Sequence, residues 1–350
     1  MKKILVFTAA IFFTGLLTCE GQESPSLKVY QNYDFIPGDK ILFEDNFVGD
    51  QDGEFPAHWE LKSGQAVLNK TSTGEEALFL TDGNYARVIP RMKTAKYLTD
   101  PFTIEYDFYA QTEGSNGLIV MFNGFDKNEG FDREASLSIT CCEVGFTPWA
   151  GEGFSKGMAG TDWTEGFRNK WHHVAIACKN HQMKVYLDQT RILVVPDTKG
   201  DFESAVFAGI GEEKNPIIFK NVRIASGGAM NMMGKKFTES KIVTHGINFD
   251  IDKATIKPES MGTLNMIVQV MKDNSDIKFE VGGHTDNSGT PAHNQTLSQQ
   301  RADAVKEQLV KMGIDATRLT TKGFGDTKPV SDNTSLEGKA NNRRVEFVKK

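Results

Sequence analysis

The sequence predicts a multidomain chain in which an all-β sandwich or jelly roll precedes a smaller α/β sandwich. Between about residues 30 and 225, apolar residues recur with a period of two in many short segments. From about residue 241, that period alternates with the helical period of 3.6. A length of 350 residues also suits two domains better than one. We expect the β-sandwich at 28–225, a polar, Met-rich linker at 226–240 and the α/β domain at 241–350.

The first residues have the composition of a secretory signal. Lys2 and Lys3 precede an apolar run, ILVFTAAIFFTGLL, that is shorter than the roughly 20 residues needed to span a bilayer. We therefore expect a signal peptide at 1–21, an exported protein and no transmembrane helix. In an alternative interpretation, the tetrapeptide LLTC resembles a bacterial lipobox, the signal ends at residue 18 and Cys19 is lipidated.

The β-sandwich is predicted from short strands that Gly, Asn, Asp and Pro separate. FTIEYDFYA at Phe102–Ala110 alternates apolar and polar residues, as a half-buried strand does. LIVMF at Leu118–Phe122 is apolar on both faces, which indicates a covered central strand. Five further strands are expected at Trp171–Cys178, Met183–Asp188, Arg191–Val195, Ala205–Ile210 and Ile217–Ile224.

Polar and aromatic residues of this region suggest several functions. Paired carboxylates are the machinery of glycosidases, although charges on the outer face of a strand are more often solvated. The carboxylates considered are Glu44, Asp45, Glu54, Glu60, Glu105 and Asp107. The aspartates of DNFVGDQDG (Asp45–Gly53) are a weak candidate for calcium, since such a segment is equally typical of turns. Candidates for stacking on sugar rings are Trp149, Trp163 and Trp171, with Trp171 expected in the core.

Cysteine usage and charge exclude some other classes. Cys141, Cys142 and Cys178 form no C-x-x-C pair, so no zinc site is expected. Either a bridge from Cys178 to one of the other two or buried free thiols fits their placement. A net charge of −6, without a basic stripe, argues against general affinity for nucleic acid.

The C-terminal region predicts the element order β-α-β-α-β-β. Its strands are expected at Thr244–Asp250, Ile277–Gly283, Arg318–Gly325 and Arg343–Val348. Pro258 suits the first position of a helix, and apolar residues follow it with helical spacing. A second helix is expected to begin after an N-cap at Ser298 and to end at Gly313.

The stretch GGHTDNSG, from Gly282 to Gly289, lies between a predicted strand and a predicted helix, where α/β sheets place ligand sites. Asn294 and Arg301 are expected to converge on it, with Arg301 in the first helical turn. A cation there opposes the helix dipole, which favours either an anionic ligand or an ion pair with an acid such as Asp286. His284 lacks metal-ligating partners and a nucleophile at a defined spacing, so we expect it to brace the loop.

Two family resemblances rest on these residues. WHHVA at Trp171–Ala175 and KVYLD at Lys184–Asp188 resemble a strand pair of concanavalin A-like and laminin G-like jelly rolls. Residues 243–350 resemble the peptidoglycan-binding OmpA-like domain. The second resemblance rests on five ordered motifs, which are GHTDNSG at Gly283–Gly289, NQTLSQQRA at Asn294–Ala302, GIDATRL at Gly313–Leu319, GFG at Gly323–Gly325 and NRRVEF at Asn342–Phe347.

The OmpA-like resemblance implies a non-catalytic clamp on diaminopimelate, the cross-linking amino acid of Gram-negative peptidoglycan. Its side-chain end carries an ammonium and a carboxylate on one carbon, which an acid and a guanidinium match. By the family's motif, Asp286 is the ammonium partner and Arg301 the carboxylate partner. Residues implied to line or support the pocket are Thr285, Asn294, Leu297, Arg343 and Arg344. Lys339 stands where the family usually has Arg, so we assign it no binding role.

Together these inferences predict an exported, non-enzymatic protein of the periplasm, associated with the outer membrane, that holds peptidoglycan. The β-sandwich would bind glycan or protein, or act as a spacer, and no cofactor is expected. The alternative function is a cell-wall or polysaccharide hydrolase that uses the OmpA-like domain for docking.

Overall fold

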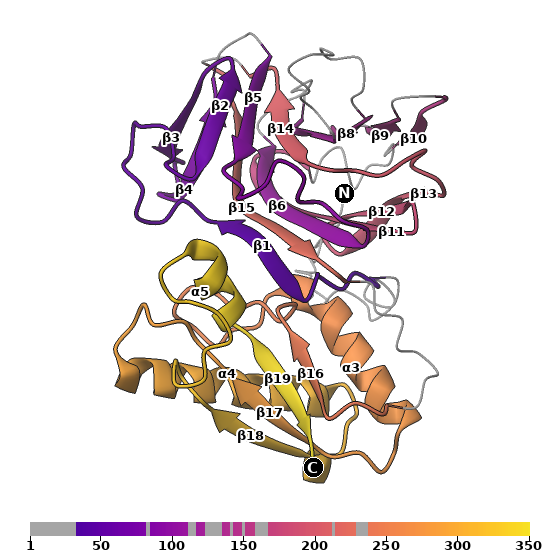
Figure 1. Cartoon of the computed structure of the whole chain (residues 1–350), viewed down its shortest axis with the longest axis vertical. Coiled ribbons are helices and arrows are strands. Elements are labelled where there is room, and N and C mark those ends of the chain that lie inside the picture. The colour runs from indigo at the N-terminus through magenta and orange to yellow at the C-terminus, as the bar shows by residue number, and fades with distance from the viewer. Residues whose placement is uncertain are drawn as a thin grey trace, which may run out of the picture.

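The computed structural model describes residues 33–81, 85–110, 117–122, 135–140, 143–148, 151–157, 167–211, 214–228 and 237–350 (Figure 1). Several predicted features lie outside these residues: the signal at 1–21 with Cys19, most of the linker at 226–240, Cys141, Cys142, Trp149 and Trp163. No helix within the described ranges is both long enough and apolar enough to cross a membrane.

The N-terminal part consists of two antiparallel sheets. The first has eight strands in the order β13-β12-β11-β6-β15-β4-β3, with β1 also paired to β15. Its strands are β1 (Lys40–Asp45), β3 (Ala66–Lys70), β4 (Glu76–Leu80), β6 (Phe102–Ala110), β11 (Lys170–Lys179), β12 (Gln182–Leu187), β13 (Thr190–Val195) and β15 (Ile217–Ser226). The second has seven strands in the order β10-β9-β8-β7-β14-β5-β2. They are β2 (Trp59–Ser63), β5 (Ala86–Pro90), β7 (Ile119–Phe122), β8 (Ala135–Ile139), β9 (Glu143–Thr147), β10 (Phe154–Gly157) and β14 (Ala205–Gly209).

One hydrophobic core joins the two sheets, and we call this part the sandwich. Trp59 is fully buried at its centre and meets the rings of Phe207 and Phe219 edge-on, with centroids at 5.5 and 5.9 Å. Because strand side chains alternate between faces, Ile104, Tyr106 and other apolar residues of the strands enter this core together. Full burial of each large apolar side chain contributes roughly 1.5–3 kcal/mol.

The strands expected in this region are confirmed with small shifts at their ends, and β6 has the predicted bounds. Two burial expectations are wrong. Trp171 lies outside the core, where it is partly buried and its indole donates to Glu75 Oε2 at 2.7 Å. Glu105, expected in solvent, is only 3% exposed. Cys178 is a buried free thiol.

The C-terminal part has a four-stranded sheet in the order β16-β19-β17-β18. Its strands are β16 (Lys241–Thr244), β17 (Phe279–Gly283), β18 (Leu319–Gly323) and β19 (Val345–Lys349). Its helices are α3 (Met261–Asp273), α4 (Pro291–Lys311) and α5 (Leu336–Asn342), with short 3-10 turns at Pro258–Ser260 and Ala316–Arg318. Strands β17 and β18 run parallel, and their apolar residues form a second core with those of α3 and α4.

Three expectations for this part require correction. The predicted order lacks α5. The first strand, expected at Thr244–Asp250, ends at Thr244. The second helix begins at Pro291 and is capped by Thr290, whose side chain accepts the His293 amide, so Ser298 is not its N-cap. Its predicted end is confirmed, because Gly313 has the positive φ of +95° that a helix C-terminus favours.

The two parts contact one another through β1 and α5 (Figure 1). Asn341 donates from Nδ2 to the Ile41 carbonyl at 2.9 Å and accepts the Ile41 amide at 3.0 Å. Lys93 pairs with Glu337 at 2.8 Å. Ile36, which precedes β1, packs against the C-terminal core. Hydrogen bonds between the Asn341 side chain and the backbone of Ile41, an ion pair and an apolar contact therefore join the sandwich to the C-terminal part.

Candidate functional site: a charged pocket between the two parts

The site begins at the carboxyl end of β17, where the chain leaves the sheet and enters the loop before α4. Backbone hydrogen bonds hold this loop from both sides. The His284 amide donates to the Arg344 carbonyl at 3.1 Å, and the Thr285 amide donates to the Gly325 carbonyl at 2.9 Å. Gly283 is required at the end of the strand, because a Cβ there would lie 2.2 Å from the Ser298 carbonyl oxygen. The close approach of β17 to α4 thus positions the next residues of the loop.

Asp286 is held as a buried, ionised carboxylate. It is 7% exposed, its Oδ1 accepts the Ser288 amide at 2.9 Å, and its Oδ2 accepts Nη1 of Arg343 at 2.5 Å. Burial alone would raise the pKa of Asp286, but the hydrogen bonds from Ser288 and Arg343 lower it below the usual range. The carboxylate is therefore charged at neutral pH and fixed in direction.

Arg301 lies in the middle of α4, not in its first turn as expected, so the helix dipole does not explain it. Its Nε donates to the Lys253 carbonyl at 2.9 Å and its Nη2 to the Asp250 carbonyl at 3.4 Å. The guanidinium also lies 4.9 Å from the ring centroid of Phe249. Among the described residues no carboxylate forms an ion pair with it, including Asp286, so this cation is oriented but not neutralised.

Asn294, Leu297 and Thr285 adjoin these two charges. Asn294 is buried in the first turn of α4 and donates from Nδ2 to the carbonyls of Asp286 at 3.1 Å and Gly289 at 3.3 Å. It therefore fixes the loop. Leu297 lies one turn before Arg301 and is 8% exposed. Thr285 is buried, and its hydroxyl has no hydrogen-bond partner in the described ranges of the chain.

The two consecutive arginines have different surroundings. Arg344 is buried and donates to Glu346 Oε1 at 2.8 Å and to the carbonyls of Asn342 and Lys328. Its guanidinium therefore stabilises the fold. Arg343 is more exposed and pairs with both Asp286 and Glu44, a residue of the sandwich. The sequence contains no local signal for the contact with Glu44, because 299 positions separate the two residues.

His284 has the surroundings of a bracing residue. It is 5% exposed and stacks on Phe324, with ring centroids 4.8 Å apart and planes within 6°. Neither ring nitrogen has a hydrogen-bond partner among the described residues. Burial, followed by the nearby Arg344 charge, lowers the pKa of His284 to about 4, so the ring is neutral at physiological pH.

All seven predicted binding residues line one pocket of about 1210 Å³ between the two parts of the chain. Its opposite wall is formed by the sandwich, with residues of β1, β6, β11 and β15. Four of the six carboxylates considered for catalysis lie in this wall: Glu44, Asp45, Glu105 and Asp107. The pocket therefore combines the predicted clamp with a charged face that the sequence did not associate with it.

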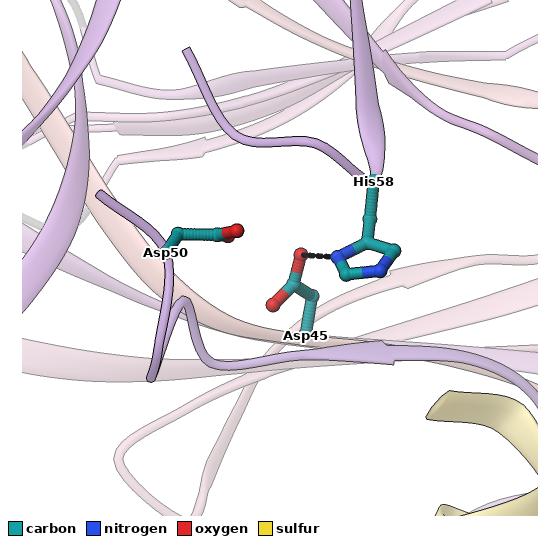
Figure 2. Close-up of side chains that lie close together, drawn as sticks. All are labelled: Asp45, Asp50 and His58. Atoms are coloured by element: carbon teal, nitrogen blue, oxygen red, sulfur yellow. Dashed lines mark ion pairs between the residues drawn. The ribbon is translucent and has the colours of Figure 1, made fainter. Parts of the chain in front are cut away.

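Asp45, Asp50 and His58 lie at one edge of this pocket, with one ligand atom of each within 4.8 Å of the others (Figure 2). Both Asp45 oxygens already accept hydrogen bonds, Oδ1 from the Phe47 amide at 2.9 Å and Oδ2 from the Trp59 indole at 3.0 Å. Calcium prefers six to eight oxygen ligands, and this group offers two carboxylates and an imidazole. Asp45 therefore serves the fold by anchoring Trp59.

The four-stranded sheet and its helices form a small α/β domain that is attached to a β-sandwich and contributes Asp286 and Arg301 to the pocket. Residues 248–343 match the model of the OmpA family, and this region is an OmpA family domain.

Relatives that this chain resembles over part of its length include three proteins. The chain is 46% identical over 100 residues to outer membrane porin F of Pseudomonas fluorescens, which is 29% of this chain and 31% of that protein. It is 42% identical over 104 residues to the probable lipoprotein YiaD of Escherichia coli, and the match covers 30% of this chain and 48% of that protein. It is 38% identical over 107 residues to the peptidoglycan-binding protein ArfA of Mycobacterium tuberculosis, covering 30% and 33%. The chain thus spans less than half the length of each relative.

Proposed function

We propose that this chain is a non-catalytic cell-envelope protein that holds peptidoglycan by clamping the zwitterionic end of diaminopimelate. Asp286 accepts the ammonium, and Arg301 donates to the carboxylate. The observation that carries the proposal is that one pocket contains both an oriented, ionised Asp286 and an Arg301 guanidinium that forms no ion pair with any described carboxylate. Charge-assisted hydrogen bonds of this kind are roughly twice as strong as neutral ones.

The comparisons support the same assignment. The OmpA family match covers both residues of the clamp, and ArfA is named as a peptidoglycan-binding protein. Names of other relatives refer to the outer membrane and to a lipoprotein. On this basis we place the chain in the periplasm, in association with the outer membrane, with Cys19 as a candidate lipidation site.

Co-sedimentation of the full chain with purified peptidoglycan tests the proposal. Asp286→Ala and Arg301→Ala should each weaken binding about tenfold or more, since each loses a charge-assisted hydrogen bond. The fraction that sediments with peptidoglycan should fall accordingly. Asp276→Ala and Lys311→Ala remove exposed charges outside the pocket and serve as matched controls. Wild-type sedimentation of both clamp variants would contradict the proposal.

A further inference from the structure

The pocket is larger than its clamp requires. Its volume of about 1210 Å³ exceeds the roughly 300–1,000 Å³ of pockets that enclose a whole drug-sized ligand. The zwitterionic end of one amino acid occupies only a small part of such a space. The remaining volume faces the sandwich, where Glu44, Glu105 and His173 form part of the wall.

A continuous series of ion pairs connects the clamp to that wall. Asp286 forms an ion pair with Arg343 at 2.5 Å, and Arg343 forms another with Glu44. Glu44 pairs with Arg223, which lies 3.8 Å from Glu105 Oε1. Acidic and basic groups alternate along the series, so the sandwich wall carries fixed charges next to the clamp.

The series ends at a buried triad on β6 and β11. Glu105 Oε2 lies 3.5 Å from His173 Nε2, and His173 Nδ1 lies 2.7 Å from Asp107 Oδ1. The two carboxylates hold a proton on the imidazole against the effect of burial and raise the pKa of His173 to about 10. The protonated ring presents an N–H at both nitrogens.

Two buried atoms of this triad lack hydrogen bonds. Glu105 is 3% exposed, and its Oε1 accepts no hydrogen bond from any residue that the structure describes. His173 Nε2 lies 3.5 Å from Glu105 Oε2 and likewise makes no hydrogen bond within the described part of the chain. A buried polar atom that makes no hydrogen bond is destabilising relative to one that makes it. Glu105 Oε1 and His173 Nε2 thus each have an oppositely charged neighbour but make no hydrogen bond to a described residue. A ligand group that both donates and accepts can supply a hydrogen bond to each of them.

We propose that the sandwich supplies the second wall of the peptidoglycan site, in which Glu105 and His173 bind an amide or a hydroxyl of the wall fragment. Both groups have the required chemistry, the amide from the stem peptide and the hydroxyl from the glycan strand. This inference rests on the proposed function, because Asp286 and Arg301 anchor the same fragment. The sandwich then takes part in ligand binding and is more than a tethered spacer.

Calorimetric titration of the full chain with three soluble probes tests the inference. The probes are free meso-diaminopimelate, a stem tripeptide that ends in it, and the same tripeptide bearing the disaccharide. Wild type should bind one of the two larger probes about tenfold or more tightly than the free amino acid, as expected for a hydrogen bond to a charged group. A gain already present with the tripeptide assigns the group to an amide, and a gain only with the disaccharide assigns it to a hydroxyl.

Glu105→Ala and His173→Ala should each reduce this preference to about threefold or less, as loss of the hydrogen bond requires. Glu143→Ala, an exposed carboxylate on β9 in the other sheet, is the matched control. Thermal unfolding of each variant checks that it is folded, and two independent variants keep the test valid if one of them is not. Equal affinity of wild type for all three probes, or an undiminished preference in a folded variant, would overturn the inference. Failure of wild type to bind free diaminopimelate would instead overturn the proposed function.

Discussion

Arg343 donates from Nη1 to Oδ2 of Asp286 at 2.5 Å, so the carboxylate assigned to the ligand ammonium is already paired with a cation. The same guanidinium pairs with Glu44 of the sandwich. A ligand ammonium that approaches Asp286 therefore meets a carboxylate that is already paired with Arg343, and Arg343 is paired with Glu44 as well. Because Glu44 can retain Arg343, Asp286 can exchange one positive partner for another without leaving a buried charge unpaired.

The hydrogen bonds of Arg301 predict that a positive charge alone at this position does not give full affinity for diaminopimelate. Arg301→Lys keeps the cation but loses the planar fork that also donates to the carbonyls of Lys253 and Asp250. We expect affinity for diaminopimelate to fall about tenfold, measured by calorimetry. Arg91→Lys makes the same change at an exposed position of the sandwich and should have no effect. Wild-type affinity in Arg301→Lys would show that the fork is unnecessary.

The stacking of His284 on Phe324 predicts that shape matters more than proton chemistry at this position. His284→Phe should keep the fold and peptidoglycan binding, because the neutral ring makes no hydrogen bond through either nitrogen to a described residue. His284→Ala leaves a cavity and should lower the free energy of unfolding by roughly 2–4 kcal/mol. Chemical denaturation and co-sedimentation measure both variants. Loss of binding in a stable His284→Phe protein would indicate a chemical role for the imidazole.

The ion pairs of Glu44 predict how the stability of the fold changes as the pH is lowered. Burial would raise the pKa of Glu44, but Arg223 and Arg343 lower it from 4.5 to about 2. A carboxyl group whose pKa is lower in the folded protein than in the unfolded chain stabilises the fold above pH 4.5. That stabilisation is lost as the pH falls from 4.5 towards 2. Glu44→Gln should therefore be less stable than wild type at neutral pH, by on the order of a few kcal/mol, and equally stable near pH 2.

Denaturant unfolding of both proteins across this pH range measures that difference. Glu54→Gln neutralises an exposed carboxylate of the sandwich and controls for the change of net charge. A difference between Glu44→Gln and wild type that does not change with pH would rule out the ion pairs as its cause.

The contact between β17 and α4 predicts that the clamp depends on Gly283. In Gly283→Ala the new Cβ would lie 2.2 Å from the Ser298 carbonyl oxygen, so the helix that carries Arg301 must move. We expect a loss of roughly 1–3 kcal/mol in stability together with weaker ligand binding. Gly157→Ala, where a Cβ meets no atom within 4 Å, is the control. Unchanged thermal unfolding and binding in Gly283→Ala would contradict this positioning.

Local sequence patterns predicted seven of the fifteen strands of the sandwich but not the start of α4. Period-two alternation is a property of neighbouring residues, so β6 was predicted with its observed bounds. The start of α4 was placed at Ser298 because the apolar helical positions become regular only from Ala302 onward. Thr290 followed by Pro291 was the available signal, since an N-cap threonine before a proline is typical of a helix start.

The sandwich wall of the pocket was not predictable in this way. Glu105 and Asp107 lie on the polar side of an alternating strand, which predicts exposure to solvent. Their burial depends on charged partners from distant parts of the chain, such as Arg223 beside Glu105 and Asn221 beside Asp107. Contacts of that kind leave no periodic trace in one sequence. The clamp residues could be proposed from the sequence because the motif of the resembled family names them together.

The most direct measurement compares diaminopimelate with pimelate, which keeps both carboxylates but has no ammonium, in calorimetric titrations of wild type and Asp286→Asn. Wild type should bind diaminopimelate about tenfold or more tightly than pimelate, because only the former carries the ammonium that Asp286 accepts. In Asp286→Asn this preference should disappear. If Asp286→Asn keeps the full preference for diaminopimelate, then Asp286 is not the ammonium partner and the clamp is wrongly assigned.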